Sequence, residues 1–337
     1  MNDPASLPTD PKWPRASEWL AGGTQAWQED PSRIPDLGVL GVPAHQTSIS
    51  PTRADATPGA VRHALARYSL WAETTGTDLR ELLAVDLGDV DAPDGAAGEA
   101  RTESVVAEWP GELLMALGGD NSVTYAVAKG LRATGLVTLD AHHDVRDGVS
   151  NGSPVQRLIT DGVIDPRRIV QVGISDFANS PQYAQWVHEA GITVITRAEV
   201  ERVGIGAAMR RALEIAAGEA GPGVGPLGGT ASGARGASGS RGAAADDGLP
   251  RIHVDLDVDV CDRSVVPACP AAAPGGLSAW ELRQAARLAG RDPNVVGIDC
   301  TEVDATQDAA DQRTVRLVAL CVLEAAAGVA ERPVWEV

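Results

Sequence analysis

The residues best suited to chemistry lie in one short stretch, residues 136–147, with the sequence LVTLDAHHDVRD. An apolar run that ends at Leu139 predicts a buried strand, and Asp140, His142 and Asp144 follow it at every second position. Alternate side chains of an extended chain point the same way, so these three could converge. Clustered carboxylates repel one another, and one of them would hold a proton unless a cation binds. Mixed Asp and His ligands favour manganese, zinc or iron over calcium.

A second stretch of the same kind covers residues 251–267, RIHVDLDVDVCDRSVVP. Asp255, Asp257 and Asp259 are expected on one face of a strand, and Asp262 follows. A solvated acidic loop is the simpler alternative, but the apolar residues between the acids should face a core. Two such runs, each at the end of a hydrophobic strand, indicate a shared metal site more strongly than one run alone.

The composition limits the partners that this chain can have. Its 337 residues suffice for one large α/β domain, although length alone also permits two. A net charge of −18 and a pI near 4.7 argue against nucleic acid and an anionic membrane surface as partners. No apolar run is long enough to span a bilayer, and the N-terminus lacks the pattern of a signal peptide. We therefore expect a cytoplasmic protein whose cysteines are reduced core residues, namely Cys261, Cys269, Cys300 and Cys321.

Further apolar runs predict the strands that must position these acids. Besides the two acidic stretches, the predicted strands are Leu37 to Val42, Leu82 to Leu87, Glu112 to Leu117, Arg168 to Val172, Gly191 to Ile195 and Val295 to Ile298. Segments of helical character separate them, which predicts an α/β fold with a mostly parallel sheet covered on both faces. Ligands of such sheets bind beyond the carboxyl ends of the strands, where both acidic runs fall.

The chain is expected to divide into two parts. Residues 1–36 show no clear periodicity and are predicted to form a surface arm, whereas residues 37–337 are predicted to form a single domain. Gly, Ala and Ser dominate at about residues 218–248, which cannot bury enough apolar surface to become ordered, so we expect a flexible insertion there. Residues 91–103 are predicted to be a mobile loop, and Ser278 with Glu281 predicts a capped helix start.

Two glycines, Gly118 and Gly119, stand between a predicted strand and a predicted helix. Neither of the common glycine-rich phosphate-binding patterns is present. The glycines are therefore interpreted as room for a tight backbone turn. This turn would aim Asp120 and Asn121 toward the sheet edge that carries both acidic runs.

The order of these motifs resembles a known family. LGGDNS, DAHHDVRD, DLDVDVCD with PGGLS downstream, and TEVD with a further Asp beyond it are similar to the arginase/agmatinase (ureohydrolase) family, over about residues 38–327. The resemblance implies a three-layer αβα arginase-like fold and a binuclear manganese centre. It also implies a homo-oligomer that hydrolyses C–N bonds in small guanidines or amidines.

The resemblance assigns roles to individual residues. Two Mn²⁺ per subunit are expected, with Asp140 and Asp257 bridging them, and Glu302 is expected to hold the amidine-type nitrogens of the substrate. Asp255 is an extra acid where the family usually has a small polar residue. The implied metal ligands are Asn121, Asp140, His142, Asp144, Asp257 and Asp259.

Two positions depart from the family pattern. Asn121 replaces a histidine ligand, and an amide oxygen is a weaker donor than imidazole for a transition metal. We therefore expect one weakened metal site. Asn151 replaces a histidine that is thought to shuttle protons, and because Asn cannot titrate, the leaving amine must be protonated by another group. Asn151 is kept as a substrate-binding residue.

Arg146 indicates the substrate. Formimidoylglutamases within the family resemble this chain in having an apolar residue and then Arg after the last ligand of this motif, and some also have Asn at the position of Asn121. Arg presents a planar fork that grips a carboxylate at two points. Formimidoylglutamate has two carboxylates, whereas agmatine has none. The alternative is a salt bridge from Arg146 to Asp147 or another acid of the loop.

We expect hydrolysis of N-formimidoyl-L-glutamate to L-glutamate and formamide, a step of histidine degradation. The two cations would lower the pKa of a bridging water, and the resulting hydroxide would attack the formimidoyl carbon. Asp144 is the expected proton acceptor, and Glu302 would stabilise the tetrahedral intermediate. Two alternatives stay open: a guanidine ureohydrolase acting on agmatine, guanidinobutyrate or arginine, and a metal-poor relative that binds a ligand without catalysis.

Overall fold

The computed structural model describes residues 10–221 and 248–333. Its centre is an eight-stranded sheet with the strand order β4-β1-β5-β10-β9-β6-β7-β8, in which neighbouring strands run parallel. The strands of this sheet are β1 (Leu37–Val42), β4 (Ala84–Asp89), β5 (Leu113–Gly118), β6 (Gly135–Leu139), β7 (Ile169–Ile174), β8 (Thr193–Thr196), β9 (Ile252–Asp257) and β10 (Val295–Thr301). Two short antiparallel strands, β2 (Trp71–Ala72) and β3 (Thr77–Asp78), form a separate ribbon.

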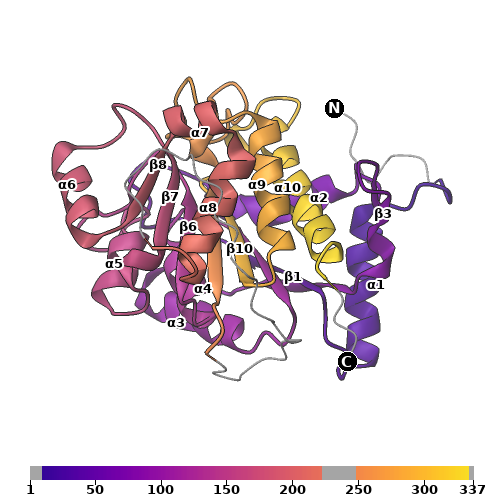
Figure 1. Ribbon diagram of the computed structural model, residues 1–337. Helices are drawn as coiled ribbons and strands as arrows, with labels where there is room; N and C mark the ends of the chain where they lie inside the picture. The colour runs from indigo at the N-terminus through magenta and orange to yellow at the C-terminus, as the bar shows by residue number, and fades with distance from the viewer. Residues whose placement is uncertain (1–9, 222–247, 334–337) are drawn as a thin grey trace.

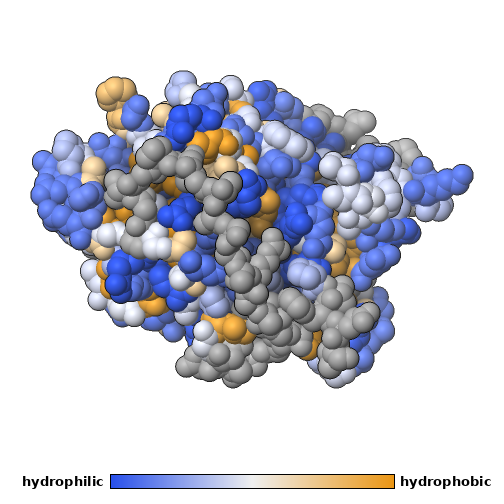
Figure 2. All heavy atoms as spheres, viewed as in Figure 1, coloured by the Kyte–Doolittle hydropathy of each residue, from blue (hydrophilic) through white to orange (hydrophobic). Residues whose placement is uncertain are grey.

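Helices cover both faces of the sheet, which gives three layers (Figure 1). One face packs against α1 (Ala16–Glu29), α2 (Thr57–Leu65), α7 (Arg197–Val203), α8 (Ile205–Ala217), α9 (Ala279–Arg291) and α10 (Arg313–Ala330). The other face packs against α3 (Gly95–Ala107), α4 (Val123–Gly130), α5 (Pro154–Thr160) and α6 (Pro181–Ala190). None of these helices has the length and apolar character needed to cross a bilayer. Hydrophilic side chains cover most of the described part of the face in Figure 2.

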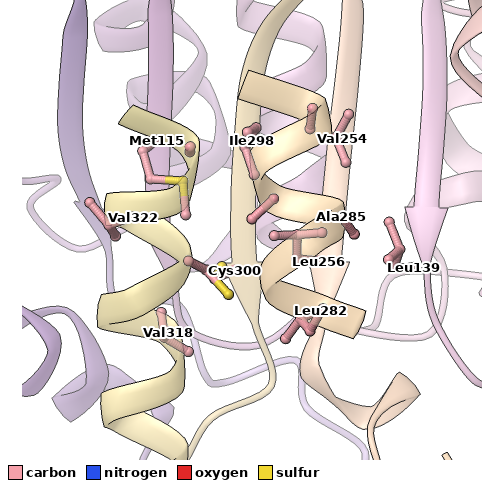
Figure 3. Packing of buried hydrophobic residues seen from close by; sticks show 14 of the residues in the cluster. Met115, Leu139, Val254, Leu256, Leu282, Ala285, Ile298, Cys300, Val318 and Val322 are labelled. Atoms are coloured by element: carbon pink, nitrogen blue, oxygen red, sulfur yellow. The ribbon is translucent and has the colours of Figure 1, made fainter. Parts of the chain in front are cut away.

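The core follows from strands that are buried on both faces. Parallel strands with helices on either side read as nearly continuous apolar runs, and the predicted strands are present with ends shifted by a few residues. The capping box of Ser278 and Glu281 is confirmed at the start of α9, and the four cysteines are free and buried. Figure 3 shows side chains of β9 and β10 packed against α9 and α10: Val254, Leu256, Ile298, Cys300, Leu282, Ala285, Val318 and Val322.

The N-terminal segment differs from the surface arm that was predicted. It includes helix α1, and Ala16 and Leu20 of this helix belong to the main core. The indole Nε1 of Trp19 donates a hydrogen bond to the backbone oxygen of Leu82 at 3.1 Å. The helix was missed because its buried face holds few large apolar residues, so the sequence shows only a weak helical period.

The prediction of a mobile loop over residues 91–103 is wrong, because α3 begins within it at Gly95. The buried face of α3 consists of Gly98, Thr102 and Val106. Gly98 lies so close to the backbone of Pro93 that a Cβ would meet its carbonyl carbon at 2.1 Å. Small residues allow this close approach but leave no apolar periodicity to recognise. The predicted insertion lies mostly outside the described residues, at 222–247.

The strand order explains how distant residues reach one edge. β5, β10, β9 and β6 are consecutive neighbours at the centre of the sheet. Because they are parallel, their carboxyl ends lie at the same edge. Asn121, Glu302 and Asp140 follow the ends of β5, β10 and β6, and Asp257 is the last residue of β9.

Replacing Gly119 tests how tightly this edge is built. An ideal Cβ at Gly119 would lie 1.8 Å from the carbonyl oxygen of Ala44, whereas a Cβ at Gly59 in α2 would meet nothing within 4 Å. We expect Gly119→Ala to lower the free energy of unfolding by about 1–3 kcal/mol through overpacking. Gly59→Ala should raise it by up to about 1 kcal/mol, because Ala is the better helix former. Urea unfolding midpoints measure both, and equal midpoints for the two variants would contradict the close contact.

Candidate metal centre and active site

Side chains from two distant segments meet beyond the carboxyl ends of β6 and β9. The Nδ1 atom of His142 lies 2.7 Å from Oδ2 of Asp259 and 3.5 Å from Oδ1 of Asp140. One ligand atom from each of these three residues lies within 4.8 Å of the others. Asp140 and Asp259 are buried, and His142 is half-buried. The structure therefore brings these three predicted ligands together.

A turn at the end of β9 places Asp259. The strand ends at Asp257, and residues 258–260 form a 3₁₀ turn. Oδ1 of Asp257 accepts a hydrogen bond from the backbone N–H of Asp259 at 2.8 Å, and Oδ1 of Asp259 accepts one from the N–H of Ala141 at 3.0 Å. The expectation that Asp255, Asp257 and Asp259 alternate on one strand face needs correction, because the turn, not the pleat, aims Asp259 at His142.

Asp144 reaches the site by a left-handed backbone conformation, with φ of 51°. The backbone after His142 is therefore not extended, in contrast to the extended chain that the sequence predicts. Oδ2 of Asp144 accepts a hydrogen bond from Nδ2 of Asn121 at 2.7 Å. Oδ1 of Asn121 faces away from the acids and lies 2.9 Å from the hydroxyl oxygens of both Thr124 and Thr301. In this arrangement Asn121 presents its amide nitrogen to the acids, and not the oxygen that the predicted ligation requires.

Burial and mutual repulsion dominate the electrostatics of the cluster. Burial, reinforced by the charge of Asp259, raises the pKa of Asp144 to about 7 and the pKa values of Asp140 and Asp257 well above the usual range. Although burial opposes a charged imidazole, the hydrogen bond and charge of Asp259 raise the pKa of His142 to about 9. For Asp259, burial acts to raise the pKa, but the contact with His142 holds it below its usual value. Divalent cations would relieve this repulsion, so the donor set fits a metal centre.

Glu302 forms the opposite side of the site. It directly follows β10, has φ of 64° and is 6% exposed. Its Oε1 accepts hydrogen bonds from the backbone N–H of Asn121 and from Nδ2 of Asn151, both at 2.8 Å. Burial raises the pKa of Glu302 to about 8, although these two donors oppose the shift. Asn151 thus orients Glu302, and its own Oδ1 is held by the N–H of Ile49 at 3.0 Å.

Arg146 lies exposed at the rim of the site. Its backbone N–H donates to the carbonyl oxygen of Gly152 at 2.8 Å, and its side chain passes over Gly152, beside Asn151. Its charge acts to lower the pKa of nearby Asp144. The alternative of a salt bridge to Asp147 is not what the structure shows, since Asp147 accepts a hydrogen bond from Gln156 at 3.0 Å. No ion pair to Arg146 is present within residues 10–221 and 248–333.

A polar layer behind the cluster was not predicted. Thr124 on α4 contacts both Asn121 and Asp299, and Nε2 of His253 lies 2.9 Å from Oδ2 of Asp299. Asp255, the extra acid, pairs in register with Asp299 on the neighbouring strand. All five are 1% exposed or less. A polar residue three positions after Asn121, at the start of a helix, was the one available sequence signal.

The fold and this acidic edge define an α/β protein suited to hold divalent cations beyond the ends of its central strands. The model of the arginase family matches residues 35–223 and 240–328. The chain therefore belongs to the arginase family. The predicted arginase-like fold is confirmed, and the gap between the two matched ranges falls within the predicted insertion.

The chain is also similar to individual proteins, in sequence and in structure. The formimidoylglutamase of Bacillus subtilis is 29% identical over 318 residues, which cover 90% of each chain. The guanidinopropionase of Pseudomonas aeruginosa is 30% identical over 203 residues, which cover 57% of this chain and 54% of that one. The crystal structure of the Bacillus subtilis formimidoylglutamase superposes with a TM-score of 0.79 at 27% identity, covering 99% and 98% of the two chains. The Trypanosoma cruzi formiminoglutamase structure with Mn²⁺ has the same fold, with a TM-score of 0.77 at 22% identity over 95% and 100% of the chains.

The raised pKa values predict that Mn²⁺ binding releases protons. An imidazole with a pKa of about 9 and an acid with a pKa of about 7 hold protons below those values, and these protons compete with a cation. Affinity for Mn²⁺ should therefore rise as pH increases from about 6 to about 9. Calorimetric titration in two buffers of different ionisation enthalpy measures the release.

A matched pair of variants controls this measurement. His142→Asn should release about one proton fewer at pH 7. His143→Asn should release as many as the unchanged protein, because burial lowers the pKa of His143 and its ring contacts Gln171 instead of the acids. A binding enthalpy that does not depend on the buffer would contradict the protonated metal-free site.

Proposed function

We propose that this chain hydrolyses N-formimidoyl-L-glutamate to L-glutamate and formamide, a step of histidine degradation in the cytoplasm. The observation that carries the proposal is Arg146, an exposed guanidinium beside the acidic centre that forms no ion pair within the described ranges. The formimidoylglutamase of Bacillus subtilis, similar over 90% of both chains, supports the same substrate. We further propose that the chain assembles as a homo-oligomer of single-domain subunits, as the family resemblance implies.

Arg146 distinguishes a substrate that carries a carboxylate from one, such as agmatine, that carries none. Formimidoylglutamate carries two carboxylates, and a guanidinium fork can bind one of them through two parallel hydrogen bonds. A substrate with a cationic end, such as agmatine, would be repelled at the same place. The backbone of Arg146 is hydrogen-bonded to Gly152, and the preceding residue, Asn151, contacts Glu302. A carboxylate bound by Arg146 would therefore leave the amidine end of the substrate within the site.

The proposed cofactor is Mn²⁺, two per chain, with the ion next to Asn121 held more weakly. Asp140, His142 and Asp259, which lie together, would help to hold one ion, and Asn121 and Asp144, which are in contact, would help to hold the other, with Asp257 as a further ligand. Four carboxylates balance two divalent cations, and the Trypanosoma cruzi formiminoglutamase structure contains Mn²⁺. When bound, the ions would make a water acidic enough to supply hydroxide near neutral pH.

The side chains of the site divide the remaining work. Both contacts to Glu302 use Oε1, so Oε2 is left to accept hydrogen bonds from the amidine nitrogens. Asp144, a carboxylate beside the place of the attacking water, is the group that would take a proton from this water and give it to the departing glutamate nitrogen. Asn151 cannot titrate, so its part is to hold Glu302 in place.

A guanidine substrate is the second candidate, supported by the guanidinopropionase that is 30% identical over 203 residues. Assays with Mn²⁺ and formimidoylglutamate, agmatine, guanidinobutyrate and arginine separate the two. Higher kcat/KM for any guanidine than for formimidoylglutamate would reject the proposal. A chain that binds fewer than one ion and hydrolyses none of these substrates would instead be a non-catalytic binder.

Removing the guanidinium tests the carboxylate contact. Arg146→Ala should raise KM for formimidoylglutamate roughly 10- to 100-fold, the value of a hydrogen bond to a charged group, with a smaller change in kcat. Arg132→Ala should leave both constants unchanged, because exposed Arg132 precedes β6 at the opposite edge of the sheet. An unchanged KM in Arg146→Ala would show that Arg146 has no part in binding the substrate.

Neutralising Glu302 tests its contact with the amidine. In Glu302→Gln the amide oxygen still accepts from Asn121 and Asn151, so the fold should persist. Above about pH 8, where Glu302 is charged, the variant should lose roughly 10- to 100-fold in kcat/KM, because a charged hydrogen bond to the cationic nitrogens is lost. Steady-state assays measure this loss, and circular dichroism checks the fold. Activity equal to that of the unchanged chain would exclude the assigned role.

A further inference from the structure

The side-chain amide of Asn121 lies between a carboxylate on one side and two hydroxyls on the other. Its Nδ2 lies 2.7 Å from a carboxylate oxygen of Asp144, and its Oδ1 lies 2.9 Å from the hydroxyl oxygens of Thr124 and Thr301. Asn121 and Thr124 are 1% exposed or less, and so is Thr301. Because these residues are buried, the polar atoms of the amide must find their hydrogen-bond partners among the surrounding side chains.

The hydroxyl of Thr124 has one hydrogen for two acceptors. Its oxygen lies 2.9 Å from Oδ1 of Asn121 and 3.0 Å from Oδ2 of Asp299. A hydroxyl donates one hydrogen, and neither an amide oxygen nor a carboxylate oxygen donates. In this orientation of the amide, Thr124 therefore satisfies only one of its two neighbours while Asp299 is a carboxylate. Nε2 of His253 also contacts Oδ2 of Asp299, at 2.9 Å, and keeps that carboxylate facing Thr124.

Rotation of the amide by half a turn removes the conflict. Both hydrogens of Nδ2 would then point at the oxygens of Thr124 and Thr301, which can accept them, and Thr124 would give its own hydrogen to Asp299. Oδ1 of Asn121 would then stand where Nδ2 now lies, 2.7 Å from Oδ2 of Asp144. Two oxygens at this distance repel unless a cation lies against both, and edges of this length are normal between oxygen ligands of one metal ion.

We propose that the side-chain amide of Asn121 rotates by half a turn when a cation binds between Asn121 and Asp144, and that Thr124 and Thr301 hold the amide in both orientations. Without the cation, Nδ2 donates to Asp144 and the two hydroxyls face Oδ1. With the cation, Oδ1 and Asp144 face the ion and the hydroxyls accept from Nδ2. Thr124 and Thr301 are thus positioning residues of the weaker metal site, and this inference rests on the metal centre proposed above.

Hydroxyls suit this task because they can donate and accept. Valine has nearly the shape of threonine but does neither, and serine does both. In a Thr124→Val/Thr301→Val variant, the cation-bound orientation would leave both hydrogens of Nδ2 buried without an acceptor. The cation-free orientation would keep its contact with Asp144 and would leave one atom, Oδ1, without a donor. Because the bound state loses the acceptors of two buried hydrogens, the double variant should disfavour the bound state more than the free state.

Titration of the metal-free full-length chain with Mn²⁺, followed by the electron paramagnetic resonance of free Mn²⁺, tests this. The unchanged chain and Thr124→Ser/Thr301→Ser should bind two ions. Thr124→Val/Thr301→Val should bind the first ion with unchanged affinity and the second at least roughly tenfold more weakly. Equal affinities in the valine and serine variants would overturn the proposal, and so would an unchanged chain that binds only one ion.

A second measurement follows the amide itself and stands if the valine variant does not fold. The side-chain N–H signals of Asn121 can be observed in asparagine-labelled chain by nuclear magnetic resonance and assigned by their absence in Asn121→Asp. Adding two equivalents of diamagnetic Zn²⁺ should shift these signals and slow their exchange with water, because the hydrogens move to the buried hydroxyls. Signals that stay in place would overturn the proposal. Neither measurement uses a substrate, so an error in the proposed substrate would not alter its outcome.

Discussion

Repulsion among buried carboxylates is the constraint on which the rest of the structure depends. Asp140, Asp257 and Asp259 are at least 96% buried and close enough that each shifts the pKa of its neighbours. A folded chain tolerates such a group only by adding protons or cations. Here a single imidazole, His142, neutralises part of the charge through Asp259. The centre is therefore built for more positive charge than its own residues supply.

The fold maintains this unfavourable group through the rigidity of its centre. The acids follow neighbouring strands whose faces are packed by two layers of helices, so the backbone at the edge cannot spread apart to relieve the repulsion. Two residues of the site, Asp144 and Glu302, also adopt left-handed backbone conformations, with φ of 51° and 64°. Such conformations cost on the order of 1–3 kcal/mol for residues other than Gly and persist where the surroundings impose them. Stability of the core thus supports geometry at the rim.

The sequence indicated the strands and the acids well but not the orientations of the side chains. Apolar runs predicted strands such as Leu37–Val42, because burial on both faces leaves few polar residues in them. Helix α3 escaped prediction, because packing through Gly98 leaves no apolar period. The direction of the Asn121 amide depends on Thr301, which is remote in sequence and arrives through the strand order. No local pattern contains that information.

Two asparagines stand where the resemblance implies histidines, and both make the same kind of contact. Nδ2 of Asn121 donates a hydrogen bond to Asp144 at 2.7 Å, and Nδ2 of Asn151 donates one to Glu302 at 2.8 Å. A histidine at either place could exchange a proton with its acid, whereas an amide only donates a fixed hydrogen bond. Proton exchange in this part of the site is therefore left to the acids themselves, whose pKa values are about 7 and about 8 in the metal-free chain. Because burial is the largest cause of both shifts, the depth of the acids in the fold makes them titrate near neutral pH in the metal-free chain, and a bound cation would reverse the shift of an acid that it contacts.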